Sequence, residues 1–408
     1  MIPSLSIQIT SVSQRIVIMR IVVCPDSFKG SLTSVEAADA IVRGIRIGAR
    51  DDSVEVISIP LADGGEGTVD ALVRATGGVI RRVKAHDPLG REIESFYGIL
   101  GDGKTAVVEM AAASGLTLLS EPERNPLVAS TYGTGELIKA AADEGVKKII
   151  VGIGGSATND AGCGALSALG ARFLDNEGNE LPPGGGSLAN LGFVDLSGFS
   201  FPSDKIEVVV ACDVRNPLYG PTGAAAVFGP QKGATADMVS VLDQGLRRWA
   251  AVIENQLGKN VAFLPGAGAA GGLGAALAAF LNAELCSGID IVLDAVGFDQ
   301  YLSEADLVIT GEGKLDEQSG FGKVVTGVLH RASAVGVPVV AVAGSCAGDL
   351  RSLYEEGLTA AFSIVPGPMT TAYAMSHAHE LLMSLSANVS RLAIVAFAHT
   401  GRAEVDSS

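Results

Sequence analysis

One local pattern recurs five times along the chain. An apolar run of strand length ends in a glycine-rich polar loop, and in at least four cases a helical pattern follows. The runs are residues 20–24, 54–59, 147–153, 206–212 and 307–310. Apolar runs that alternate with helices are typical of α/β proteins with parallel sheets. Because ligands bind at the carboxyl ends of such strands, the pattern predicts a site built from the loops.

The pattern changes between Arg81 and Val107. The segments "VKAHDPLGREIESFYGIL" and "KTAVVEM" look like a hairpin, which suits a second domain of mixed α/β character. A further change lies at the amino terminus, where no periodic pattern begins before Met19. We therefore expect residues 1–18 to be a disordered extension, with a start codon assigned too early as the alternative.

Charge and cysteine content exclude several classes of partner. The formal net charge of −16 argues against nucleic acid and against anionic membranes, because both select basic surfaces. The five cysteines form no C-x-x-C pair, which indicates free thiols in a reducing compartment such as the cytoplasm. The sequence is silent on oligomeric state, so a homodimer stays an open alternative.

Two glycine-containing segments can be compared with nucleotide-binding motifs. The residues around Gly322-Lys323 do not match a Walker A motif, because Val324 stands where Ser or Thr is required. Residues 152–157 do fit the glycine pattern of a dinucleotide loop, and Asp175 follows at about the right distance. However, the loop continues into Asp160, whose negative charge would lie close to a pyrophosphate. An NAD(P)-dependent oxidoreductase is therefore a minor alternative.

Two amino-terminal loops carry candidate site residues. In "PDSFKGS" the backbone N–H groups and Lys29 could hold an anion, although a plain surface turn is the alternative. In "ADGGEGT" the pair Asp63 and Glu66 could orient a hydroxyl group or a hydrated metal ion. The alternative for this second loop is a turn followed by a capped helix.

Two later loops add acids. Asp213 directly follows an apolar strand and is expected at the ligand edge, with a helix cap as the alternative. The loop "GEGKLDE" brings Glu312, Lys314 and Asp316 together. Two acids and a lysine suit a Mg²⁺–phosphate assembly, because the ion bridges phosphate oxygens while the lysine neutralises charge. A plain solvated loop is the alternative.

Six motifs, taken together and in this order, closely resemble the bacterial glycerate kinase family of the glycerate 2-kinase type. They are "CPDSFKGSLTSVEAADAI", "PLADGGEGTVDAL", "STYGTGELI", "GIGGSATNDAGCGALSALG", "ACDVRNPLYGPTGAAAVFGPQKGA" and "DLVITGEGKLDEQSGFGKV". The resemblance runs from Met19 to about Leu382. It implies phosphorylation of D-glycerate by ATP, with the 2-hydroxyl favoured. It also implies two α/β domains with the active site in the cleft between them.

The resemblance and the strand pattern give an expected domain layout. A Rossmann- or flavodoxin-like domain is expected from residues 19–70 plus 288–400, and an inserted α/β domain from residues 71–287. A kinase for a different small hydroxy acid and a non-catalytic metabolite-binding protein of the same fold are the remaining alternatives.

The requirements of phosphoryl transfer suggest a role for each candidate residue, with ATP and Mg²⁺ as the expected cofactors. The predicted catalytic residues are Lys29, Asp213 and Asp316. The predicted substrate-binding residues are Asp63, Glu66, Arg215 and Lys314. The predicted nucleotide-binding residues are Gly154, Gly155, Ser156, Asn159, Gly311 and Gly313. The predicted magnesium ligands are Asp213 and Glu312, and Asp213 could serve either as a ligand or as the base.

Overall fold

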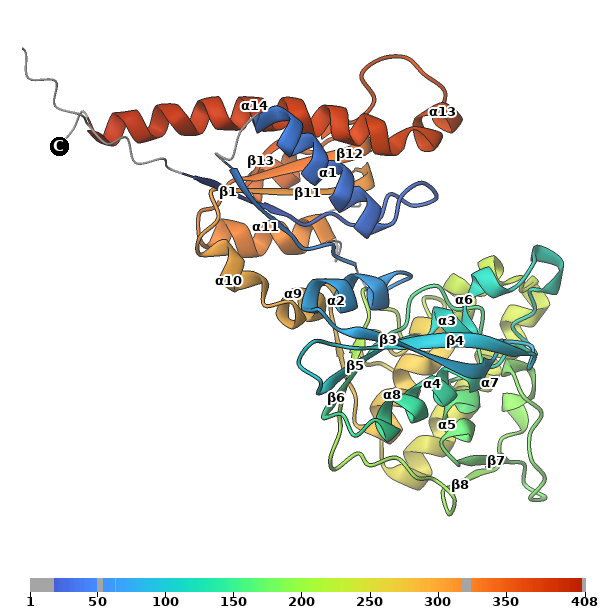
Figure 1. Ribbon diagram of the computed structural model, residues 1–408. Coiled ribbons are helices and arrows are strands. Elements are labelled where there is room, and N and C mark those ends of the chain that lie inside the picture. Colours follow the sequence, from blue (N-terminus) through green and yellow to red (C-terminus); the bar gives the residue numbers. More distant parts are fainter. Residues whose placement is uncertain (1–17, 50–53, 63, 317–323, 406–408) are drawn as a thin grey trace, which may run out of the picture.

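The predicted α/β class is confirmed by the structure, a computed structural model that describes residues 18–49, 54–62, 64–316 and 324–405 (Figure 1). The predicted disordered extension lies outside the described residues, apart from Ile18.

The described residues form strands and helices in alternation. The strands are β1 (Met19–Val23), β2 (Val54–Ser58), β3 (Val79–His86), β4 (Glu92–Ile99), β5 (Thr105–Glu109), β6 (Lys148–Gly152), β7 (Arg172–Leu174), β8 (Phe193–Asp195), β9 (Glu207–Ala211), β10 (Glu284–Cys286), β11 (Leu307–Leu315), β12 (Val339–Cys346) and β13 (Leu358–Ser363). The helices are α1 (Ser34–Ala49), α2 (Thr68–Thr76), α3 (Ala111–Ser114), α4 (Tyr132–Asp143), α5 (Cys163–Ala168), α6 (Ala224–Phe228), α7 (Ala236–Leu257), α8 (Leu273–Leu281), α9 (Gly288–Ala295), α10 (Phe298–Leu302), α11 (Val324–Ala334), α12 (Arg351–Glu355), α13 (Thr371–Ser376) and α14 (Ala378–Val405). The 3₁₀ turns are η1 (Leu116–Leu118), η2 (Glu121–Glu123), η3 (Gly185–Asn190), η4 (Pro230–Lys232) and η5 (Ala269–Gly272).

The first sheet joins the two ends of the chain. Its strand order is β13-β12-β11-β1-β2, and every pairing is parallel. The central pair brings Val22 of β1 opposite Val308 of β11. From this pair the chain continues to β2 on one side and to β12 and β13 on the other. The order therefore reverses between β1 and β11, which is the position where open α/β sheets bind ligands.

The strand β11 is longer than the sequence pattern suggested. We expected the segment from Gly311 onward to be a loop, but residues through Leu315 pair with β12 in a continuous parallel register. Glycine permits this pairing, because a Cβ at Gly311 would lie 2.1 Å from the carbonyl oxygen of Val342. The expected loop was therefore wrong as far as Leu315, and residues 317–323 lie outside the described residues.

Helices α1 and α14 cover one face of the first sheet (Figure 1). The start of α1 is the predicted capping box: the Thr33 N–H donates to the Glu36 carboxylate at 2.8 Å, and the Glu36 N–H donates to Thr33 Oγ1 at 3.2 Å. Within α14, residues Ala378–Ala398 are apolar enough and long enough to cross a membrane. The amino-terminal half of this segment instead packs on α1, with Leu382 fully buried in the core beneath.

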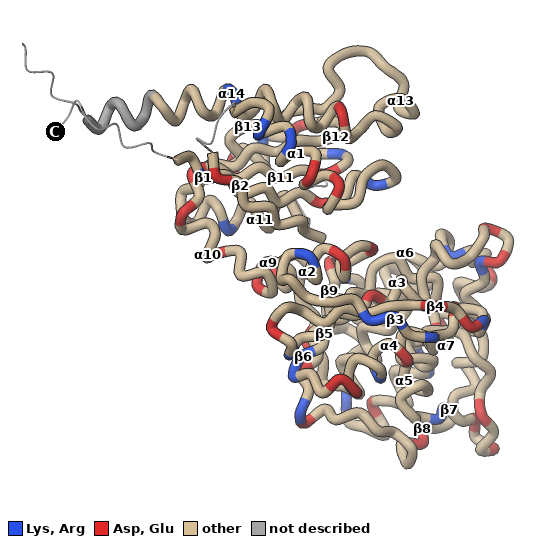
Figure 2. The backbone as a smooth tube through the Cα atoms, in the orientation of Figure 1, with Lys and Arg blue, Asp and Glu red and all other residues tan. Residues whose placement is uncertain are grey.

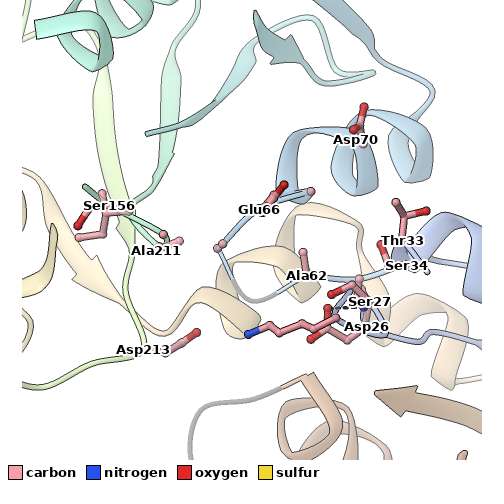
Figure 3. Close-up of a pocket in the computed structure, with 18 of the residues that line it drawn as sticks. Asp26, Ser27, Thr33, Ser34, Ala62, Glu66, Asp70, Ser156, Ala211 and Asp213 are labelled. Atoms are coloured by element: carbon pink, nitrogen blue, oxygen red, sulfur yellow. Dashed lines mark hydrogen bonds between the residues drawn. The ribbon is translucent and has the colours of Figure 1, made fainter. Parts of the chain in front are cut away.

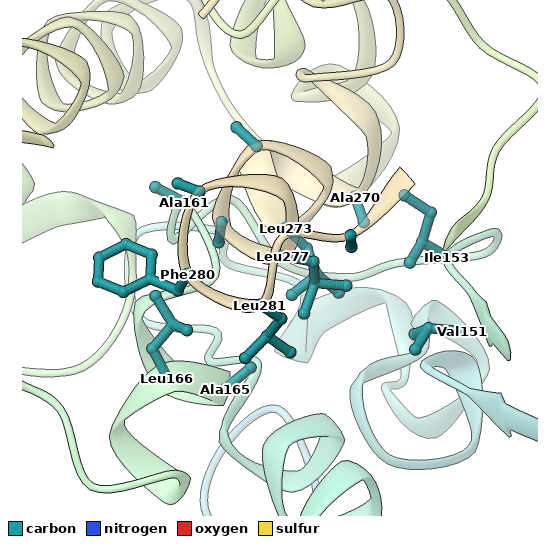
Figure 4. Close-up of a cluster of buried hydrophobic side chains, with 14 of the residues drawn as sticks. Val151, Ile153, Ala161, Ala165, Leu166, Ala270, Leu273, Leu277, Phe280 and Leu281 are labelled. Carbon is teal, nitrogen blue, oxygen red and sulfur yellow. The ribbon is translucent and has the colours of Figure 1, made fainter. Parts of the chain in front are cut away.

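The second sheet is mixed, as expected for the middle of the chain. Its order is β10-β9-β6-β5-β4-β3, in which β3, β4 and β5 pair antiparallel and the other neighbours pair parallel. On one face lies the largest apolar core, which surrounds the buried helix α8 with Leu273, Leu277 and Phe280 (Figure 4). On the opposite face, α2, α9 and α11 contribute to a core that also contains residues of the first sheet. The predicted boundaries near residues 71 and 288 stay a prediction.

Candidate active site

The loops that follow β1, β2, β6 and β9 line one cleft of about 1330 Å³ (Figure 3). The first two loops leave the first sheet, and the other two leave the second sheet. The cleft therefore lies where the carboxyl edges of the two sheets meet. The residues from 26 to 36 border one part of it, and Ser156, Asp213 and Lys232 border another.

The loop after β2 packs directly on the second sheet. Gly64 has a φ of +87°, and a Cβ there would lie only 2.6 Å from the Cβ of Ala211 at the end of β9. A Cβ at Gly152, the last residue of β6, would in turn lie 2.4 Å from the carbonyl oxygen of Gly64. These close backbone approaches exclude larger side chains. The glycines of "ADGGEGT" thus bring the edges of the two sheets into contact.

A smaller pocket of about 430 Å³ adjoins the cleft. It lies at the carboxyl ends of β1, β11, β12 and β13, with α13 and the residues just before it as a further wall. Its apolar lining includes Ile364, Val365, Met369 and Met375. Four residues line both hollows: Asp26, Ser27, Lys29 and Ser31. The two hollows therefore meet at the loop that carries Lys29.

The structure brings six of the predicted site residues together in the cleft. They are Lys29, Glu66, Gly154, Gly155, Ser156 and Asp213. Asp213 is exposed, and its carboxylate also accepts the backbone N–H of Gly288 at 2.8 Å, at the start of α9. The two alternatives for Asp213 are thus compatible, because one side chain both caps a helix and borders the cleft. Asp63 lies outside the described residues.

Other predicted residues lie apart from the cleft. Three of them, Glu312, Gly313 and Lys314, line the smaller pocket. Four line neither hollow: Asn159, Arg215, Gly311 and Asp316. Asp316 forms an ion pair with Lys314 at 2.7 Å, and Asn159 is completely buried. Gly311 is an internal residue of the sheet, and its carbonyl oxygen accepts the N–H of Asp26 at 2.8 Å.

The sequence interpretation missed Lys232. This lysine borders the cleft, yet only 2% of its surface is exposed. Its ammonium group donates hydrogen bonds to Ser156 Oγ at 2.6 Å and to the carbonyl oxygen of Thr158 at 2.7 Å. Burial lowers the pKa of Lys232 to about 7, while the negative charge of Asp160 opposes that shift. Lys232 belongs to the fifth motif of the sequence, but it follows the short helix α6 and not a strand, so its position in the sequence does not mark it as a site residue.

Asp160 organises the loop beneath these residues. It is fully buried, and its carboxylate accepts the N–H and hydroxyl of Thr131 at 2.8 Å each, just before α4. It also accepts the N–H groups of Gly162 at 3.1 Å and Gly164 at 3.2 Å, where α5 begins. Burial nevertheless raises the pKa of the Asp160 carboxyl. The acid that argued against a dinucleotide loop is thus a structural group in the protein interior.

The acidic side chains of the cleft suit a magnesium ion that binds mainly through the phosphate groups of a substrate. Among the described residues, no group of three His, Cys, Asp or Glu side chains could enclose a metal ion. Mg²⁺ commonly binds through one or two carboxylates together with substrate phosphates and water. The carboxylates of Glu66 and Asp213 border the cleft and fit that requirement. Figure 2 shows Lys and Arg positions interspersed with Asp and Glu positions along the backbone.

The chain is similar to known proteins along nearly its whole length. Residues 21–394 match the family model described as the glycerate kinase family. The glycerate kinase of Bacillus subtilis (strain 168) is 51% identical over 364 residues, which are 89% of this chain and 95% of that protein. The glycerate 2-kinase of Escherichia coli (strain K12) is 46% identical over 94% of this chain and 100% of its own length. A crystal structure from Salmonella typhimurium LT2, described as glycerate kinase 2, is 46% identical with a TM-score of 0.83, over 94% of this chain and 99% of that chain.

Proposed function

The chain belongs to the glycerate kinase family and is therefore a phosphotransferase, and from this premise we propose that it transfers the γ-phosphoryl group of ATP to the 2-hydroxyl of D-glycerate. The product is 2-phosphoglycerate. The observation that carries the proposal is the meeting of the two hollows at Lys29, with the exposed carboxylates Glu66 and Asp213 bordering the larger one. Phosphoryl transfer needs this combination of a cation, acids and two adjoining binding spaces.

The two hollows suit the two substrates. The smaller pocket has an apolar wall of Ile364, Met369 and Met375, which matches a purine ring. From there the triphosphate can extend past Lys29 into the larger cleft, because the loop from Asp26 to Ser31 borders both spaces. Glycerate then occupies the larger cleft. This assignment gives Gly313 a place near the nucleotide and Glu66 a place near glycerate.

Two side chains act on the reacting groups in this proposal. Lys29 is exposed at the junction of the two hollows, so its ammonium group neutralises charge on the transferring phosphoryl group. Asp213 accepts the proton of the 2-hydroxyl as the bond to phosphorus forms. Magnesium binding is the second role open to Asp213, and Glu312 lines the smaller pocket as the other proposed ligand. When bound with ATP, Mg²⁺ neutralises negative charge on the phosphate oxygens.

The proposal is tested by turnover of purified protein. ATP consumption is measured with Mg²⁺ and a panel of small hydroxy acids, with D-glycerate as the expected substrate. Phosphorus NMR of the product identifies the hydroxyl group that was phosphorylated. Turnover of another hydroxy acid with glycerate untouched would contradict the substrate assignment. Phosphorylation of the 3-hydroxyl would contradict the regiochemistry alone.

The family assignment leaves the NAD(P)-dependent alternative without support. We propose a cytoplasmic location, which fits free thiols: the two buried cysteines, Cys24 and Cys163, are unpaired, as are the three more exposed ones.

A further inference from the structure

Lys232 is buried, and a positive charge in the protein interior is energetically unfavourable. Removing an ammonium group from water is unfavourable unless hydrogen bonds and opposite charge compensate. Its two acceptors, Ser156 Oγ and the Thr158 carbonyl oxygen, are neutral. Asp160 is the charged group that acts on it among the described residues, and η4 brings no other charged side chain. A lysine that only filled space here would be replaced at less cost by an apolar side chain.

The hydrogen bond to Lys232 fixes the direction of the Ser156 hydroxyl. In its charged form Lys232 can only donate, so Ser156 Oγ must then accept in this contact. The hydroxyl proton of Ser156 is then left to donate elsewhere, and no acceptor for it occurs in the described part of the chain. Ser156 itself borders the cleft. Its hydroxyl is thus held ready to donate to a group bound in the cleft.

The loop around Ser156 carries further unused donors. Within the described ranges, no acceptor is found for the backbone N–H of Gly155 or of Ser156. Gly155 has a φ of +73°, and successive N–H groups around a left-handed residue form concavities that bind anions. The third N–H of Lys232 also lacks a partner among the described residues. Gly155 is exposed, so its N–H can meet water, whereas Ser156 and Lys232 are buried. Because buried polar groups are normally paired, the unused donors of Ser156 and Lys232 point to a ligand.

We propose that Ser156, the backbone at Gly155 and Lys232 form an anion-binding site that holds a carboxylate or phosphate group of a bound substrate. Ser156 donates its hydroxyl to the anion directly. Lys232 is the positioning residue: it orients that hydroxyl and supplies a positive charge behind it. The inference rests on the proposed function for the identity of the ligands, which are glycerate with its carboxylate and ATP with its phosphates.

The site couples anion binding to proton uptake. Because burial lowers the pKa of Lys232 to about 7, much of the Lys232 population is neutral at pH 8 in the free protein. An anion bound beside Ser156 favours the charged form and raises this pKa. Binding of the correct ligand at pH 8 should therefore be accompanied by proton uptake.

Isothermal titration calorimetry tests the proposal without turnover. D-Glycerate alone and a non-hydrolysable ATP analogue with Mg²⁺ are each titrated at pH 8, in two buffers that differ in ionisation enthalpy. The ligand that takes up the proton is the one whose anionic group binds at Ser156. We expect Lys232→Met to abolish that uptake and to raise the Kd for that ligand by roughly 10- to 100-fold. Lys104→Met, which changes an exposed lysine in the turn between β4 and β5, is the matched control and should leave uptake and Kd unchanged.

The Ser156→Ala variant removes the hydroxyl that donates to the anion and leaves Lys232 in place. It should raise the Kd for the same ligand by roughly tenfold while the protein keeps its Tm. Wild-type affinity of Ser156→Ala for both ligands would overturn the proposal. If Lys232→Met unfolds, as its Tm would reveal, the affinity of Ser156→Ala still decides. Normal wild-type turnover of glycerate together with unchanged affinity of Ser156→Ala would overturn this site and leave the proposed function standing.

Discussion

The carboxylate of Glu109, at the end of β5, accepts the backbone N–H of Val69 in the first turn of α2 at 2.6 Å. Its second oxygen accepts the N–H of Gly67 at 3.2 Å. One buried acid thus ties the second sheet to the helix that follows the glycine-rich loop of the first sheet. Burial raises the pKa of Glu109 to about 7, although these two N–H donors oppose the shift and the charges of Asp70 and Glu66 add to it.

This contact predicts a pH-dependent stability. Because the folded protein holds the Glu109 proton more tightly than the unfolded chain, its contribution is greatest below pH 4.5 and declines as the pH rises to about 7. The loss is on the order of 3 kcal/mol over that range. Glu109→Gln cannot titrate and should lack this part of the decline, as measured by urea unfolding at pH 5 and pH 8. Glu177→Gln, at an exposed carboxylate, is the control, and an equal decline in wild type and Glu109→Gln would refute the assignment.

Asp213→Asn should lower kcat by roughly 10²-fold or more, because the amide cannot accept the substrate proton or hold Mg²⁺ as a carboxylate does. Asn retains a side-chain oxygen for the N–H of Gly288, so the Tm should stay near that of wild type. Steady-state kinetics and thermal unfolding measure the two effects. Near-normal kcat in Asp213→Asn, with a lowered Tm in Asp213→Ala, would reduce Asp213 to a helix cap.

Lys29→Met should lower kcat/KM by roughly 10²-fold, since it removes the cation at the junction of the two hollows. Lys29 is exposed, so we expect little change in stability. Kinetics with glycerate and ATP varied in turn will show which substrate is affected. Unchanged kinetics for both substrates would mean that the loop from Asp26 to Ser31 is only a surface turn.

Gly64→Ala should destabilise the protein more than Gly67→Ala, by about 1–3 kcal/mol. The two glycines have nearly the same backbone conformation, with φ of +87° and +89°, so the cost of a side chain in the left-handed region is shared. A Cβ at Gly64 would collide with Ala211, whereas a Cβ at Gly67 would meet nothing within 4 Å. Unfolding by urea measures the difference. Equal destabilisation by the two substitutions would show that the loop after β2 is not tightly packed on the second sheet.

The fold class could be predicted because its signals are local. Most parallel strands are apolar runs followed by turn residues, and some helix starts carry their own cap, as Thr33 and Glu36 show for α1. The end of β11 could not be predicted in this way. Gly311 and Gly313 are typical of a loop when the local sequence alone is considered. However, the neighbouring strand β12 provides hydrogen-bond partners that continue β11 to Leu315.

The candidate site, like the fold, could be predicted from the sequence only in part. The sequence by itself determined that Lys29, Glu66, Ser156 and Asp213 lie in loops at the carboxyl ends of strands, because strand direction and loop position follow from the order of the chain. Only the tertiary structure decided which of these loops share a cleft and which residues stand behind them. Lys232 reaches Ser156 across 76 positions of sequence, and its burial and lowered pKa exist only once the surrounding residues are packed. Distances between loops and the loss of water around a charge are properties of the folded chain, so no pattern in the sequence could reveal them.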